Sequence, residues 1–140
     1  MLHLAKLCVG VRDVRHLRAL QKARREGDPP LRHRTRNFPR RADEILEGGS
    51  IYWVIAGAMV VRQRVVDIRP DARDDGTACA GLVLAPRLVP VAGRLVKPFQ
   101  GWRYLLPEDA PPDLDSRSAA QGEAELPVSL RRALLDLGLL

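Results

Sequence analysis

The sequence predicts a single domain of the α+β class, built on a small, mostly antiparallel curved sheet or barrel. Two observations support this prediction. β-branched and aromatic residues are concentrated in short segments separated by glycine, proline and aspartate, a pattern typical of strands joined by turns. Helical periodicity occurs only in two segments of the first third and one segment at the C-terminus. The length of 140 residues fits one domain.

The first third of the chain is predicted to contain one strand and two helices. Residues 2–11 carry two valines in a loosely alternating pattern and are expected to form a strand. Asp13 is a suitable N-cap for a helix over 13–26, which has a narrow apolar stripe. The segment 27–39 contains three prolines and a glycine, so a loop is expected. Residues 40–47 are expected to form a short helix that a Gly-Gly pair ends.

The middle of the chain is predicted to form the sheet. Residues 50–57 are a dense run of strand formers, and a glycine separates them from a second strand over 58–68. The alternation of this second strand is imperfect, so a β-bulge is expected near Val65. Residues 77–85 are predicted to form a third strand. Two prolines in 86–93 predict an edge strand or an irregular crossing.

The last part of the chain changes in composition. An aromatic-rich segment over 97–105 completes a compact domain that is expected to span 1–106. Residues 107–125 are acidic and rich in proline, alanine and serine, which is typical of a linker. Residues 126–140 are predicted to form an amphipathic helix. We expect this helix to pack back on the domain, because a short helix has little stability alone, with docking on a partner as the alternative.

The positive charge is concentrated in the first half of the chain. The formal net charge is +6, yet residues 1–70 carry +8 and residues 71–140 carry −2. Eleven basic residues lie within 12–41, against three acidic ones. This asymmetry favours a polyanionic partner, with nucleic acid first and an anionic membrane surface second. The alternative is a solvated basic face with no dedicated ligand.

Several classes of protein are not indicated. The start of the chain lacks the apolar stretch and cleavage site of a signal peptide, and no apolar run approaches the roughly 18 residues of a membrane span. We therefore expect a cytoplasmic protein without a membrane segment. The two cysteines predict no disulfide scaffold, and Cys8 is expected to be buried and inert. The three histidines lack metal-ligand spacing, so neither a metal nor a cofactor is expected.

The best candidate for anion binding is the arginine-rich segment 32–37. Guanidinium groups present a planar fork of donors to phosphate oxygens, and neutral hydroxyl groups add further hydrogen bonds. The expected phosphate-binding residues are Arg32, Arg34, Thr35, Arg36, Arg40 and Arg62. The alternative is a solvated loop that forms salt bridges to Asp43, Glu44 or the acidic C-terminal part of the chain.

A second candidate is the aromatic segment near the end of the predicted domain. Trp102 and Tyr104 are expected to line a cleft beside the arginines, where they would stack on a nucleobase. Arg103 would contribute charge, and Gln100 is a candidate for hydrogen bonding to a base edge. The alternative places these aromatic rings in the hydrophobic core.

Four blocks of sequence carry a family resemblance: KLCVGV, RTRNFPRRADEILEGGSIYWVIAG, RQRVVDI and KPFQGWRYLLPEDAPPDL. Together they resemble the uncharacterised bacterial proteins grouped as domain of unknown function 1489, found mainly in alphaproteobacteria, over roughly residues 2–114. The resemblance implies a small cytoplasmic protein and brings no activity, substrate or catalytic residue. The order of elements around Gly48-Gly49-Ser50 is also similar to that of PUA/ASCH-like barrels, which implies an antiparallel barrel and a role in RNA or modified-base recognition.

Taken together, the residues favour non-catalytic binding of RNA or another phosphate-bearing ligand. One alternative is an enzyme that acts on a nucleotide-like substrate, for which Asp67 and its neighbouring arginines are the nearest acid–base set. Another is a protein-interaction module that uses the C-terminal helix. No residue is assigned a catalytic role, and the sequence carries no signal for the oligomeric state.

Overall fold

The structure is a computed structural model that describes residues 1–114, so the helix expected over 126–140 and most of the expected linker lie outside the described residues. The elements follow one another as β1 (His3–Leu7), α1 (Val14–Gly27), β2 (Arg32–Thr35), α2 (Ala42–Leu46), β3 (Ser50–Ile55), β4 (Ala58–Ala72), β5 (Ala78–Leu95), β6 (Trp102–Leu105) and the 3-10 turn η1 (Pro107–Asp109). The α+β class is thus confirmed. None of the described helices is long and apolar enough to cross a membrane.

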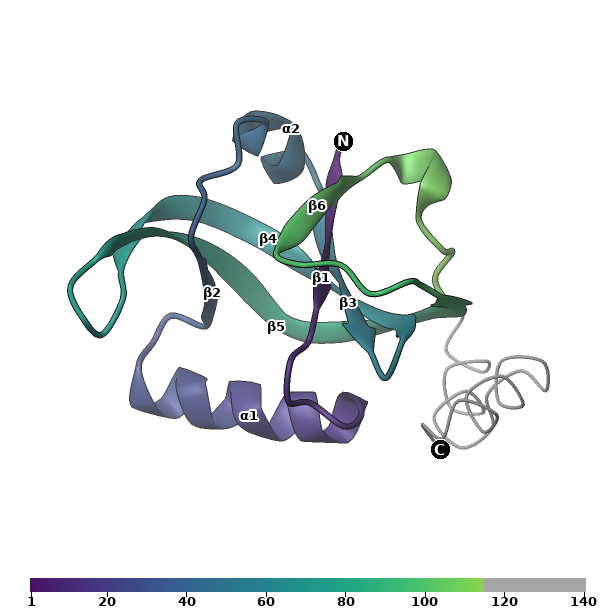
Figure 1. The fold of residues 1–140 in the computed structure, drawn as a ribbon, viewed down its shortest axis with the longest axis horizontal. Coiled ribbons are helices and arrows are strands. Elements are labelled where there is room, and N and C mark those ends of the chain that lie inside the picture. The colour runs from purple at the N-terminus through teal and green to yellow at the C-terminus, as the bar shows by residue number, and fades with distance from the viewer. Residues whose placement is uncertain (115–140) are drawn as a thin grey trace.

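The six strands form one sheet in the order β2-β5-β4-β3-β1-β6 (Figure 1). Its pairs are antiparallel except for β1 and β3, which run parallel. The strands β2 and β6 lie at opposite edges and do not pair with each other, so the sheet is curved and open rather than a closed barrel.

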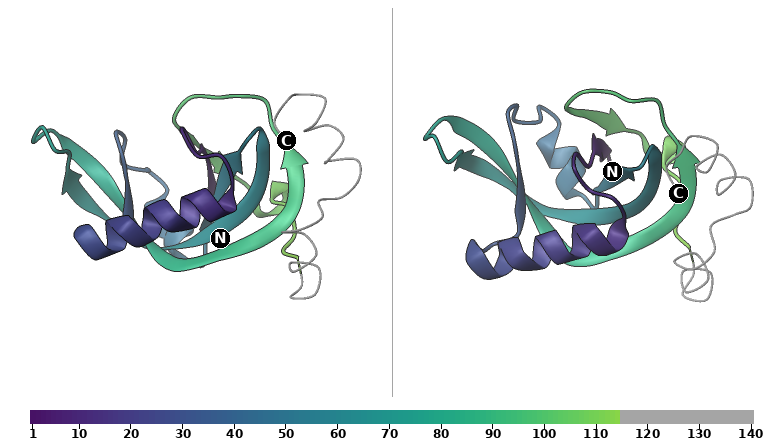
Figure 2. Two further views of the ribbon diagram at one scale, coloured as in Figure 1. Left: turned by 90° about the horizontal axis from the view of Figure 1, so that it is seen from below. Right: turned by 60° about the horizontal axis from the view of Figure 1, so that its bottom comes forward.

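The curvature comes from the two longest strands. The pairing of β4 with β5 shifts register between Met59 and Val61, between Gln63 and Val65, and between Val65 and Asp67. The bulge expected near Val65 is therefore confirmed. Each extra residue bends the strand and increases its twist. Figure 2 shows the result, a long curved hairpin with α1 lying alongside it.

The strand β5 is longer than the sequence indicated. It runs without a break through two prolines, Pro86 and Pro90, so the division into segments 77–85 and 86–93 is wrong. Only the first part of β5 pairs with β2, in the register Arg32↔Val83. The prolines lie beyond that part, where β2 no longer pairs with β5 and, among residues 1–114, only the short segment around Asp113 pairs with it, at Val91. A proline is tolerated at such an edge because no ladder hydrogen bond needs its missing N–H.

The segment 27–39 also contains a strand, β2, where only a loop was expected. Its sequence Arg-His-Arg-Thr is polar and has no run of strand-forming residues, so the sequence did not indicate a strand here. The strand exists because the first part of β5 offers unpaired backbone groups at the sheet edge, and β2 satisfies them. Ion pairs described below hold its two arginine side chains.

The two helices are held at their ends as the sequence chemistry requires. The carboxylate of Asp13 accepts a hydrogen bond of 2.7 Å from the backbone N–H of His16 at the start of α1. After α2, Gly48 has a φ of 102°, which L side chains rarely adopt. A Cβ on Gly49 would collide with the backbone oxygens of Leu2 and Ile45. The Gly-Gly pair therefore ends α2 and lets the chain turn closely into β3.

The core lies on both faces of the sheet. Alternate residues of β3 enter two hydrophobic clusters: Ile51, Trp53 and Ile55 join the larger one, and Tyr52 and Val54 join the smaller one. The larger cluster includes Leu17 from α1 and Ile45 from α2, so both helices pack on the same core.

Residues 112–114, within the segment expected to be a linker, pair with β5. Asp113 forms an isolated β-bridge with Val91. The backbone N–H of Leu114 donates to the carbonyl of Pro90 at 3.1 Å, and the N–H of Ala92 donates to the carbonyl of Pro112 at 2.8 Å. The first residues of the expected linker therefore pack against β5.

Candidate functional site

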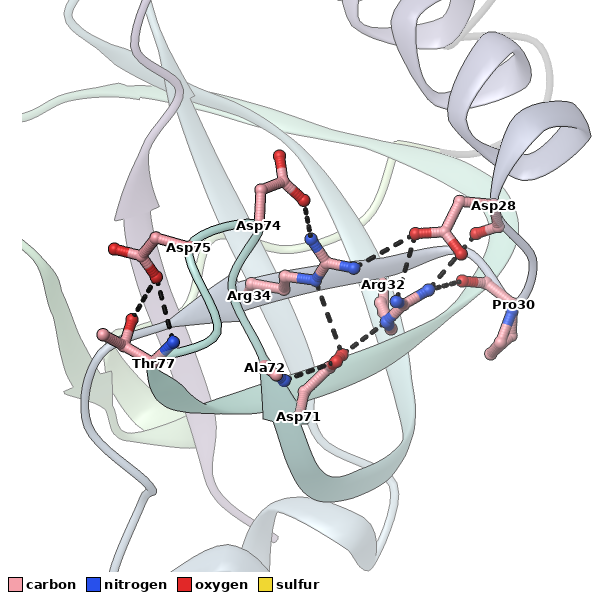
Figure 3. A network of polar contacts seen from close by, with 9 residues as sticks. All are labelled: Asp28, Pro30, Arg32, Arg34, Asp71, Ala72, Asp74, Asp75 and Thr77. Carbon is pink, nitrogen blue, oxygen red and sulfur yellow. Dashed lines mark hydrogen bonds and ion pairs between the residues drawn. The ribbon is translucent and has the colours of Figure 1, made fainter.

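Arg32 is placed on β2 and is engaged by carboxylates (Figure 3). Its Nε donates to the carboxylate of Asp71, and its terminal nitrogens donate to the Asp28 carboxylate at 3.1 Å and to the carbonyls of Asp28 and Pro30. Only 10% of the side chain is exposed. The hydrogen bond from Arg32 lowers the pKa of Asp71, as expected for a carboxylate held beside a guanidinium.

Arg34 belongs to the same network. Its two terminal nitrogens donate to Asp74 and Asp28, each at 3.1 Å, and its Nε lies 3.7 Å from the carboxylate of Asp71. Two guanidinium groups thus face three carboxylates, and the network has no surplus positive charge. It joins β2 to the end of α1 and to the β4–β5 turn, as Figure 3 shows. These two residues therefore have a structural use in the described fold.

The other expected phosphate contacts are scattered. Thr35 is buried on β2. Arg62 lies on β4, where it forms a bidentate pair with Asp113, with both N···O distances 2.6 Å, and donates to the hydroxyl of Ser50 at 3.0 Å. Arg36 and Arg40 are exposed, and the described residues give them no ion pair. The structure therefore does not gather the expected set around one ligand position.

The aromatic segment forms the edge strand β6. The rings of Trp102 and Tyr104 meet edge to face with centroids 5.0 Å apart, and both are half-buried against the larger core cluster. The hydroxyl of Tyr104 accepts a hydrogen bond of 3.1 Å from the backbone N–H of Arg41. Arg103 is exposed over the ring of Phe99, 4.0 Å from its centroid, and Gln100 is exposed in the preceding turn. None of these side chains lines either of the two cavities below.

A basic groove lies between α1 and β5. Its volume is about 370 Å³, and its lining residues are Arg18, Gln21, Lys22, Arg25, Pro86, Arg87 and Leu88. We call it the α1–β5 groove. Three of its four cations come from one side of α1 at i, i+4 and i+7 spacing, which places them in a row along the helix. The fourth comes from β5, and no carboxylate is among the lining residues.

A buried amide network fixes both walls of this groove. The side chains of Gln21 and Gln63 exchange two hydrogen bonds, of 2.8 and 2.9 Å. Gln63 also donates to the carbonyl of Ala85 at 2.7 Å and accepts from the indole N–H of Trp53 at 3.1 Å. Since Gln21 belongs to α1 and Ala85 precedes the groove residues of β5, the network holds helix and strand at a set separation.

The charged residues that line the groove are all basic. Like charges at i and i+4 on a helix repel, at a cost of about 0.2–0.5 kcal/mol per pair. A place in the last turn of α1 favours Arg25, because the helix dipole is negative there. That effect does not account for Lys22 in the middle of the helix or for Arg87 on β5. An anion in the groove would offset the repulsion between Lys22, Arg25 and Arg87.

A second cavity lies on the other side of α1, and we call it the Trp53 cleft. Its volume is about 160 Å³, and its lining includes Lys6, Cys8, Arg24, His33 and Trp53. Nε2 of His33 is buried without a hydrogen-bond partner among residues 1–114. Such an unpaired nitrogen costs about 1–3 kcal/mol.

Burial governs the ionisation of the two titratable groups in this cleft. It lowers the pKa of His33 to about 4, with smaller contributions from Lys6 and Arg24. It raises the pKa of Cys8 to about 11, against the effect of the same two cations. Both side chains are therefore uncharged near neutral pH, and Cys8 lacks the thiolate character of a nucleophile.

The acid–base candidate from the sequence lies apart from both cavities. Asp67, considered above as an acid–base group, is exposed at the bulge of β4, accepts from the backbone N–H of Ile68, and lines neither cavity. Within residues 1–114, no three or more His, Cys, Asp and Glu side chains are placed to hold a metal ion.

The family comparison agrees with the resemblance found in the sequence. A family model described as "Protein of unknown function (DUF1489)" matches residues 4–140. The chain belongs to the DUF1489 family. Neither the curated proteins nor the solved structures include a match to this DUF1489 protein. The site must therefore be argued from its own residues.

The sequence contained part of the signal for the α1–β5 groove. The row of Arg18, Lys22 and Arg25 follows from helical spacing alone and was available. The contribution of Arg87 could not be predicted from the sequence, because its position opposite α1 depends on the bend of β5 and on β5 continuing through Pro86.

Proposed function

We propose that this DUF1489 protein binds RNA or another phosphate-bearing ligand without catalysis, and that it does so through the α1–β5 groove. The observation that supports the proposal is the groove lining, in which Lys22, Arg25 and Arg87 lie together and no carboxylate is among the lining residues. Arginine and lysine side chains in a row contact successive phosphates of a nucleic-acid backbone. The proposal includes a cytoplasmic location and a distant likeness to PUA/ASCH-like barrels.

The groove favours RNA over an anionic membrane surface. A helix that lies in a membrane interface exposes an apolar face beside its basic one. In α1 the apolar side is used by the domain, since Leu17 is buried in the larger core cluster. The cations line a groove between a helix and a strand, a shape that fits a chain of phosphates better than a flat lipid surface.

Two matched double variants test the proposal. Lys22→Gln/Arg25→Gln removes two groove cations, and Arg36→Gln/Arg40→Gln removes two exposed cations outside the groove. Binding of a fluorescein-labelled single-stranded RNA is followed by anisotropy. Each phosphate contact in single-stranded RNA contributes about 0.7 to the slope of log K against log salt, so we expect the groove variant to bind roughly 20-fold more weakly at about 0.1 M salt. The control variant is expected to bind like the wild type.

Three other outcomes would contradict the proposal in different ways. Equal losses in the two double variants would show that binding uses the general basicity of the surface, and the groove would have no special role. A loss confined to Arg36→Gln/Arg40→Gln would move the site to the β2–α2 loop. Absence of binding by the wild type at low salt would overturn the proposed function itself.

A further inference from the structure

The Trp53 cleft has the size of a binding site for one ring. Its volume is about 160 Å³. An engineered cavity of about 150 Å³ with apolar walls binds benzene in another protein. The walls of the Trp53 cleft include the indole of Trp53 and the buried side chains of Leu17, Leu31 and Leu84. A planar ring would therefore find apolar contacts on more than one side.

Three cations are among the residues that line the cleft. Lys6, Arg24 and Arg32 line it, and no carboxylate is among the lining residues. Arg32 is already engaged by Asp28 and Asp71. The other two cations are less committed: the ammonium group of Lys6 donates to the carbonyl of Leu7 at 3.2 Å, and Arg24 is exposed.

His33 adds a polar group inside the cleft. Its Nε2 has no hydrogen-bond partner among the described residues, and the ring meets that of Trp53 edge to face with centroids 5.3 Å apart. Because burial keeps its pKa far below neutrality, the imidazole contributes one donor and one acceptor rather than a charge. The positive charge of the cleft thus comes from its lysine and arginine side chains and not from His33.

We propose that the Trp53 cleft binds a small organic anion that has a single planar ring, with the ring against Trp53 and the acidic group at Arg24 and Lys6. This site is separate from the proposed RNA groove, because the two share only Gln21 among their lining residues. Its test does not depend on whether RNA binds.

The two tryptophans of the chain provide a reporter and its control. Trp53 lines the cleft, and Trp102 lines neither cavity. Benzoate is titrated to about 10 mM, and the two indole N–H signals are followed by ¹H–¹⁵N NMR, a range that detects millimolar dissociation constants. We expect a saturable shift of the Trp53 signal and no shift of the Trp102 signal. If Trp53 does not respond to benzoate or to nicotinate, or if Trp102 responds equally, the proposal is wrong.

Two comparisons test the charge and the ring separately. Benzyl alcohol keeps the ring without the charge, and inorganic phosphate keeps a charge without the ring. We expect both to bind more weakly than benzoate, and we expect Arg24→Gln to weaken benzoate binding roughly two- to five-fold, as for one exposed ion pair. Arg36→Gln, which removes an exposed arginine outside the cleft, is expected to change nothing. Equal binding of benzoate and benzyl alcohol, or of benzoate and phosphate, would contradict the proposed ligand class.

Discussion

His33 is expected to make the stability of the domain depend on pH between about 6.5 and 4. Its ordinary pKa is 6.5, and burial, helped by Lys6 and Arg24, lowers it to about 4 in the folded protein. In this range the unfolded chain binds a proton that the folded protein does not. The stability that depends on a neutral His33 is therefore fully present above the pKa of the unfolded chain, and it is lost as the pH falls toward the pKa of the folded protein.

The size of the effect follows from the shift. A difference of one pKa unit corresponds to about 1.4 kcal/mol, so a fall from pH about 7.5 to about 4.5 lowers the free energy of unfolding by roughly 2–3 kcal/mol through His33. The carboxylates Asp71 and Asp113 act at lower pH, because their pKa values are lowered from 3.8. The pKa of His3 is also lowered, by burial first and then by Arg62, and adds a change of the same sign.

The variant His33→Leu separates this contribution from the others. Urea unfolding at both pH values gives the free energy of unfolding for the wild type, for His33→Leu and for the control His16→Gln. We expect the wild type and the control to lose about 2–3 kcal/mol more than His33→Leu between the two pH values. Parallel losses in all three proteins would refute the assignment of the titration to His33.

Three further changes test the fold around the sites. Gly49→Ala is expected to unfold the domain or to lower its thermal midpoint severely, because the new Cβ meets the backbone of Leu2; a wild-type melting curve would contradict the tight turn. Gln63→Leu should cost roughly 3 kcal/mol or more in urea unfolding, since it leaves buried partners at Gln21, Trp53 and Ala85 unpaired; a cost below 1 kcal/mol would show the network to be unimportant. Asp113→Asn should lower the free energy of unfolding by about 0.5–1 kcal/mol and speed hydrogen exchange of the Leu114 amide, because the pair with Arg62 is weakened. An unchanged exchange rate would contradict this role of the pair.

The elements with a strong local signal were predictable. The N-cap at Asp13, the dense strand-forming run of β3 and the stop at Gly48-Gly49 each depend on neighbouring residues only, and the structure has them close to the expected positions. The bulge near Val65 was also visible, as an interruption of strict alternation.

The features that the sequence did not predict depend on contacts between residues far apart in the chain. β2 is a strand because β5 provides an edge for it and because three aspartates, one after α1 and two at the β4–β5 turn, neutralise its arginines. From the sequence alone, Arg32 and Arg34 are expected to be available cations. Their neighbours in sequence do not show that Asp71 and Asp74 lie beside them in the fold. For the same reason the sequence did not indicate that Gln21 and Gln63 pair with each other and fix the walls of the groove.

The central claim is that the groove cations Lys22, Arg25 and Arg87 contact the phosphates of a nucleic acid. The most direct measurement is the dependence of RNA affinity on salt, from about 50 to about 300 mM, for the wild type and for Lys22→Gln/Arg25→Gln. Three contacts predict a slope of log K against log salt of about −2.1, and removal of two predicts about −0.7. A slope that is near zero in the wild type, or that is the same in both proteins, would contradict the claim.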